Sequence, residues 1–64
     1  MSRIRRDGYV FVTWIGDHAP RHVHVYGDGR LVVKWDLDNG QPMEGSATTA
    51  VRKLIETLVE EGLL

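Results

Sequence analysis

All three histidines of the chain fall within seven positions of one segment, which reads DHAPRHVHV. His22 and His24 are separated by one residue, so on a β-strand both project from the same face, with Cβ atoms about 6.5–7 Å apart. That spacing allows two imidazoles to bind one metal ion or one phosphate. His18 precedes them on a loop restricted by Pro20, from which it can fold back toward the pair. The segment therefore predicts a site built from imidazoles.

One interpretation of this segment is a metal site. Three imidazoles around zinc with an open fourth position form a known catalytic arrangement, so His18, His22 and His24 are candidate metal ligands. The chain has no carboxylate at an obvious fourth-ligand spacing, and Asp17 or Asp36 would serve only to orient the imidazoles. Zinc is the cofactor under this interpretation, and the other interpretations require none.

A second interpretation is acid–base chemistry on RNA. One imidazole would take the proton of a 2′-hydroxyl and another would protonate the leaving oxygen, because histidine titrates near the working pH. The candidate catalytic residues are His18, Arg21, His22 and His24, with Arg21 stabilising the charged phosphorane. The candidate binding residues, which would stack on bases or pair with phosphate, are Trp14, Tyr26 and Arg30.

A third interpretation gives the histidines no chemistry. An alternating His-Val-His strand can simply present polar side chains to solvent, and His18 can cap the turn that Pro20 fixes. For Trp14 and Trp35 the corresponding expectation is core packing, the usual position of large aromatic side chains. The residues themselves leave all three interpretations open.

The elements that position these residues are predicted from hydrophobic periodicity and turn signals. Strict alternation over residues 21–26 places Val23 and Val25 on one side of a strand and the histidines on the other. Aromatic and β-branched residues mark an earlier strand, and Asp-Gly and Asn-Gly dipeptides predict hairpin turns. The predicted strands span residues 9–15, 21–26, 31–37 and 41–44, and Pro42 confines the last of them to an edge.

A helix is predicted over residues 47–61, where the hydrophobic period changes from two to about 3.6. Ser46 is its predicted N-cap. At the other end Gly62 can adopt the left-handed conformation of a Schellman motif, which sets Leu63 against Leu58. The predicted fold is α+β, a three- to four-stranded antiparallel sheet followed by one C-terminal helix packed on one face. Its predicted core consists of Val23, Val25, Val33, Leu54, Ile55 and Leu58.

The composition is that of one small domain over residues 1–64. The 64 residues are 42% hydrophobic and 27% charged, which is ordinary for a folded chain with a thin core. Cysteine is absent, so the sequence has no disulfide framework and no thiolate metal site. Apolar runs stay far below the roughly 18 residues of a membrane helix, and the first residues do not resemble a signal peptide. We therefore expect a cytoplasmic protein without membrane contact.

The charge distribution is more informative than the total. The formal net charge is −1, from eight basic and nine acidic residues, which gives no general case for a nucleic-acid or membrane partner. Arginines gather within residues 3–6, however, and glutamates within residues 56–61. Such a basic arm is usually solvated, with contact to phosphate as the functional alternative.

The first predicted strand is apolar on both faces, because Val10, Val12 and Trp14 alternate with Tyr9 and Phe11. A single helix covers only one face of a sheet. A large exposed apolar patch is unusual on a monomer. We therefore expect a homo-oligomer or a complex with a small partner protein, with RNA as a further partner.

The segment HAPRHVH, at residues 18–24, resembles the hallmark of a family of short bacterial proteins, domain of unknown function 4160. In that family His-x-Pro-Pro-His-x-His follows an aromatic-rich strand. The resemblance continues through the glycine-rich turn after residue 26, the hairpin at residues 39–40, the stretch at residues 43–45 and the closing helix. Arg21 stands where the second proline is usual, which loosens the turn and adds a cation beside the histidines.

The resemblance implies one component of a toxin–antitoxin-type pair, since members are often encoded beside another small protein. Small RNA-cleaving toxins with a catalytic histidine also present it from a sheet packed on helices, which is an analogy of architecture. The function implied is binding or cleavage of RNA through the histidine cluster. The alternatives are a non-enzymatic module that docks a partner protein, and a three-histidine metal-binding domain.

Overall fold

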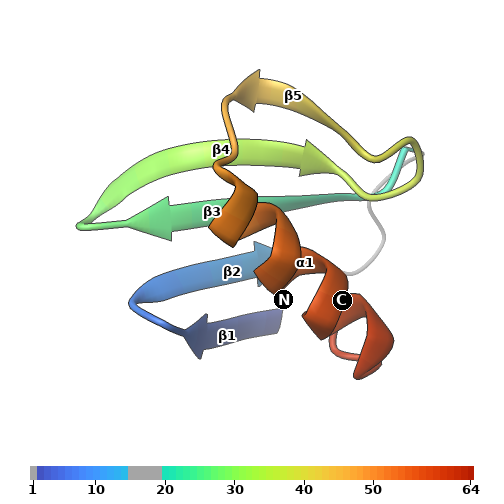
Figure 1. Cartoon of the computed structure of the whole chain (residues 1–64), viewed down its shortest axis with the longest axis horizontal. Coiled ribbons are helices and arrows are strands. Elements are labelled where there is room, and N and C mark those ends of the chain that lie inside the picture. Colours follow the sequence, from blue (N-terminus) through green and yellow to red (C-terminus); the bar gives the residue numbers. More distant parts are fainter. Residues whose placement is uncertain (1, 15–19) are drawn as a thin grey trace.

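The computed structural model describes residues 2–14 and 20–64. These residues form a five-stranded antiparallel sheet, in which the strands lie in chain order, and a helix that follows it (Figure 1). The elements are β1 (Ser2–Arg6), β2 (Tyr9–Thr13), β3 (His22–Gly27), β4 (Arg30–Asp36), β5 (Gln41–Gly45) and α1 (Thr49–Glu60). The predicted α+β class and C-terminal helix are confirmed, and the sheet has one strand more than expected.

The additional strand is β1, which pairs with β2 through a two-residue hairpin. Asp7 and Gly8 join them with φ of 52° and 83°, and Arg6 is opposite Tyr9. Two successive positive φ values are the requirement of a type I′ turn, and Asp-Gly meets it with little strain. The predicted Asp-Gly hairpin between β3 and β4 has the same character, with φ of 53° and 75° at its central residues.

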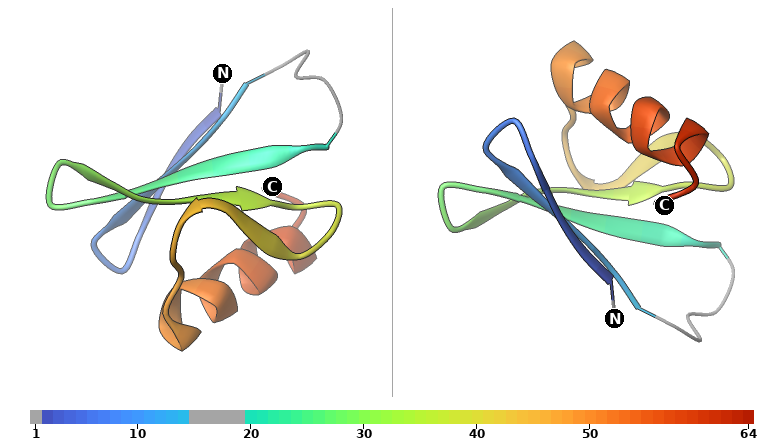
Figure 2. Two further views of the ribbon diagram at one scale, coloured as in Figure 1. Left: turned by 90° about the horizontal axis from the view of Figure 1, so that it is seen from above. Right: turned by 90° about the horizontal axis from the view of Figure 1, so that it is seen from below.

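Helix α1 lies on one side of the sheet (Figure 2). The residues that the helix buries against the sheet form a single apolar cluster, which excludes water from that face. Leu54, which was predicted to lie in the core, is half-buried at the margin of this cluster. The cluster contains Phe11, Val23, Val25, Val33 and Trp35 from the sheet and Val51, Ile55 and Leu58 from the helix. The predicted register of β3, with both valines inward, is therefore confirmed. Pro42 lies on β5, an edge strand, as predicted.

The two ends of α1 differ in how well the sequence predicted them. The N-cap is Thr48 and not Ser46, because the Thr48 hydroxyl accepts a hydrogen bond of 3.2 Å from the backbone N–H of Val51. At the C-terminus the predicted Schellman bonds are present, from the N–H of Gly62 to the carbonyl of Val59 and from that of Leu63 to Leu58. The side chain of Leu63 is nevertheless 45% exposed, and Leu64 packs against the core.

In the described part of the chain no helix is long and apolar enough to cross a membrane.

Candidate functional site

His22 and His24 lie on the sheet face that points away from α1, which we call the open face. Register and alternation assign its members, because residues opposite one another on neighbouring strands share a face. His24, for example, is opposite Val12 on β2 and Lys34 on β4. The open face carries Arg3, Arg5, Val10, Val12, Trp14, His22, His24, Tyr26, Leu31, Lys34, Asp36, Gln41 and Glu44.

Four rings of the open face form a connected series centred on His24. The Trp14 and His24 rings meet edge to face, with centroids 4.7 Å apart. His22 and His24 have centroids 5.3 Å apart, and Tyr26 stacks beyond His24 at 6.4 Å with planes only 14° apart. Four candidate binding or catalytic residues are thus brought together. The expectation of core packing is confirmed for Trp35, which is 7% exposed, and is wrong for Trp14, which is 41% exposed.

His22 has two polar neighbours. Its Nδ1 lies 3.3 Å from the carbonyl oxygen of Pro20, and Asp36 is its cross-strand neighbour on β4. Asp36 is 3% exposed, and its carboxylate accepts hydrogen bonds from the side-chain amide of Asn39 and from the N–H groups of Asp38 and Asn39. The hydrogen bond from the Asn39 side-chain amide is the main reason that the pKa of Asp36 lies below its usual value. The charge of His22 acts in the same direction. Asp36 therefore stabilises the turn that ends β4 and places a negative charge on the strand position opposite His22.

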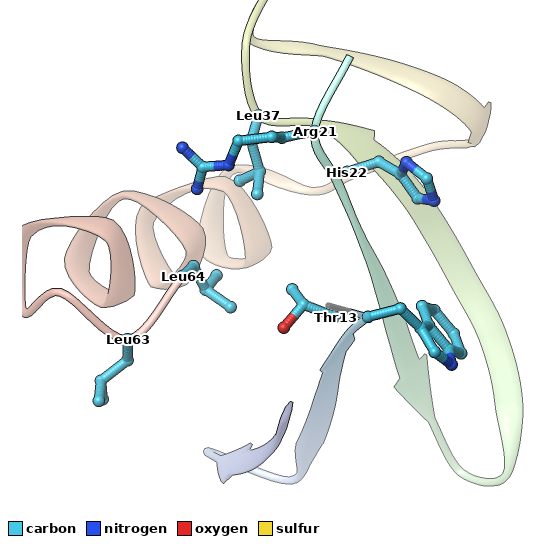
Figure 3. Close-up of a pocket in the computed structure, with 7 residues that line it drawn as sticks. Thr13, Arg21, His22, Leu37, Leu63 and Leu64 are labelled. Atoms are coloured by element: carbon cyan, nitrogen blue, oxygen red, sulfur yellow. The ribbon is translucent and has the colours of Figure 1, made fainter. Parts of the chain in front are cut away.

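Arg21 is not brought into the ring series. Its backbone is fixed by a hydrogen bond from its N–H to Asp38 and by another from the N–H of Leu37 to its carbonyl, both 2.8 Å long. Its guanidinium extends toward the side of Leu64, whereas the His22 ring lies on the opposite side of β3 (Figure 3). Both residues line a cavity of about 300 Å³ at the end of the strands, together with Thr13, Trp14, Leu37, Leu63 and Leu64.

The remaining predicted residues are placed as follows. Arg30 is opposite Gly27 at the far end of the hairpin from His22, so the structure does not bring it to the histidine pair. His18 and Asp17 lie outside the described residues, as does Ile15. Among residues 2–14 and 20–64 no group of three or more histidine, cysteine, aspartate or glutamate side chains is arranged to hold a metal ion.

Sequence reasoning missed part of the open face. Arg3 and Arg5 are opposite Val12 and Val10, and they reach this face only because β1 is a strand. The signal that could have identified it is the Asp7–Gly8 dipeptide after an alternating stretch, since Asp-Gly is a strong hairpin signal. Lys34 was also missed, although its place between buried Val33 and Trp35 follows from strand alternation.

The fold and the open face define a small α+β domain with a helix on one side of its sheet and an imidazole-rich face on the other. The chain belongs to the family described as Domain of unknown function (DUF4160), which matches residues 8–62. The resemblance noted from the histidine segment is thereby confirmed, and β1 lies before the matched residues. No curated protein and no solved structure matches the chain significantly.

Proposed function

We propose that the open face binds single-stranded RNA and that the protein acts in a toxin–antitoxin-type pair, as the family resemblance implies. The observation that carries the proposal is the ring series of Trp14, His22, His24 and Tyr26, with neighbouring centroids 4.7–6.4 Å apart. Proteins that bind single-stranded RNA commonly stack bases on rings presented by an uncovered sheet face. Bases within a duplex are already stacked on one another, so this face favours a single strand.

Cleavage is the more specific form of the proposal. The His22 and His24 rings are 5.3 Å apart, so both imidazoles can reach the same phosphodiester. One would take the proton from a 2′-hydroxyl as it attacks phosphorus, and the other would donate a proton to the departing 5′-oxygen, leaving a cyclic phosphate. Such a reaction needs no metal and follows a bell-shaped pH profile.

The test compares the parent protein with the His22→Ala, His24→Ala double variant. Binding of a labelled 12-nucleotide RNA and of its duplex is measured by fluorescence anisotropy, and products are separated on a denaturing gel. Base–ring stacking contributes about 1–3 kcal/mol per base, so losing two rings weakens binding by roughly thirtyfold or more. Thr57→Ala, on the exposed side of α1, is the matched control and should bind as the parent does.

Each outcome has a distinct meaning. Preference for the single strand, lost in the double variant alone, supports RNA binding. Product that appears only with the parent supports cleavage as well. Absence of binding by the parent at protein concentrations that saturate a typical weak RNA site contradicts the proposal.

A second candidate, docking of a partner protein or a second copy, is favoured by the apolar part of the open face. Trp14 is 41% exposed there, and Val10, on the same face of the sheet, is half-buried. Sedimentation over a wide dilution range, repeated with Trp14→Ser, tests this candidate. Self-association that Trp14→Ser abolishes supports docking of a second copy, and a monomer at every concentration contradicts it.

A further inference from the structure

The charges of the open face are segregated across the sheet. Arg3 and Arg5 lie on β1, at one edge, and both are exposed. On the opposite side Glu44 of β5 is the cross-strand neighbour of Lys34, so its negative charge offsets that of the lysine. Asp36 adds a further negative charge on that side. A polyanion on this face is therefore attracted toward β1.

The two arginines of β1 are available for such a contact, whereas the third arginine of the strand is not. Arg6 belongs to the helix side, where its guanidinium makes two hydrogen bonds of 2.9 Å with the carboxylate of Glu61. This pair holds the pKa of Glu61 below its usual value. Arg3 and Arg5 form no ion pair with any other residue that the structure describes.

Register relates the arginines to the rings. Arg3 is opposite Val12, which is opposite His24, and Arg5 is opposite Val10, which is opposite Tyr26. The Cα atoms of Arg3 and Arg5 therefore lie about 9.5 Å from those of His24 and Tyr26, two strands away. Between them lie the half-buried Val10 and Val12, which is only 8% exposed, so a sugar that crosses β2 would pass mainly over Val10.

The rings themselves follow the strand direction. His22, His24 and Tyr26 alternate along β3, so their Cβ atoms are spaced by about 6.5–7 Å, and Arg3 and Arg5 have the same spacing on β1. Two parallel rows result, one of rings and one of guanidiniums. The repeat of both rows suits an extended nucleotide strand that places one base on each ring.

We propose that β1 is the phosphate-binding strand of this face: about three nucleotides lie along β3 with their bases on the rings, their sugars over the valines and their phosphates on Arg3 and Arg5. This assignment rests on the proposed RNA-binding function. It adds the orientation of the RNA across the sheet, the number of nucleotides bound and the residues that neutralise the phosphates. It also places these contacts on a strand outside the residues that match the family.

The experiment measures the salt dependence of RNA affinity for the Arg3→Gln, Arg5→Gln double variant. Each phosphate contact on a single strand contributes about 0.7 to the slope of log affinity against log salt, so the slope should fall by about 1.4. Affinity at low salt should fall by roughly tenfold or more. The matched control is Arg52→Gln, Lys53→Gln, which also removes two positive charges but from exposed residues of α1, where the Arg52 guanidinium lies 5.6 Å from the centroid of the Trp35 ring, and its slope should stay near that of the parent. Far-ultraviolet circular dichroism confirms that both variants fold.

Oligonucleotides of two, three, six and nine nucleotides test the length. Affinity for the oligonucleotide should rise sharply up to three nucleotides. Beyond that length it should increase only slightly, because a longer oligonucleotide merely offers more three-nucleotide stretches that can occupy the site. A reduced slope in the β1 variant alone supports the assignment. An unchanged slope in the β1 variant, or equal reductions in both variants, overturns it while the proposed RNA binding stands. Absence of RNA binding by the parent overturns both.

Discussion

Gly45, which ends β5 and begins the connection to α1, should be the least replaceable of the glycines within residues 2–14 and 20–64. Its φ is 76°, a conformation that costs an L-residue about 1–2 kcal/mol. A Cβ at this position would also press on the carbonyl oxygen of Val32, closer than real atoms approach, and would lie 3.2 Å from Cα of Val33. Both contacts are with the backbone of β4, which can move only if β4 and β5 separate.

The matched control is Gly40, whose φ is 66° but where an added Cβ meets nothing within 4 Å. Gly40→Ala should therefore lose only the conformational part, about 1–2 kcal/mol of unfolding free energy. Gly45→Ala should lose that amount of unfolding free energy and about 1–3 kcal/mol more, because the added Cβ overpacks the contact with β4. Urea unfolding followed by tryptophan fluorescence measures both losses. Equal losses in the two variants would refute the steric reasoning and show that β5 tolerates displacement from β4.

Two further predictions concern the helix start and the turn after β4. Thr48→Ala should lower the unfolding free energy by about 1 kcal/mol through loss of the N-cap bond, whereas Ser46→Ala should change it by less than about 0.5 kcal/mol; a larger effect at Ser46, measured by urea unfolding, would contradict the cap assignment. The lowered pKa of Asp36 means that its contribution to stability is present above the unfolded-state pKa of about 3.9 and is lost as the pH falls through the lower folded-state value. Asp36→Asn should therefore unfold at lower urea than the parent at pH 7 and show a flatter profile toward pH 2, with Glu61 supplying the residual pH dependence; parallel profiles for parent and variant would exclude a role for the carboxylate charge.

Features with a local cause were predictable from the sequence. The register of β3 follows from strict alternation, and the end of α1 follows from the position of Gly62. The strand β1 was not predicted because arginine-rich stretches lack the β-branched and aromatic residues that usually mark a strand. Ser46 and Thr48 are both competent caps by residue type, so the sequence does not choose between them, and in the structure Thr48 accepts from the N–H of Val51.

Features that depend on which face the helix covers were not predictable. Strand β2 is apolar on both sides, so its sequence does not show whether Phe11 or Val12 meets α1. Trp14 and Trp35 are similar in sequence context, yet one lies on the open face and the other in the core. Arg21 immediately precedes β3, and its separation from His22 becomes evident only with the direction of each side chain.

The two tryptophans allow the most direct test of RNA binding at the open face, because each reports on a different side of the sheet. In a ¹⁵N-labelled sample the indole N–H signals of Trp14 and Trp35 are followed as a single-stranded RNA hexamer is added. RNA binding at the open face should produce a saturable shift of the signal of Trp14, whose ring lies against His24, and little change in the signal of Trp35, which is buried in the core. A shift confined to Trp35, or no shift of either signal at excess RNA, would contradict it.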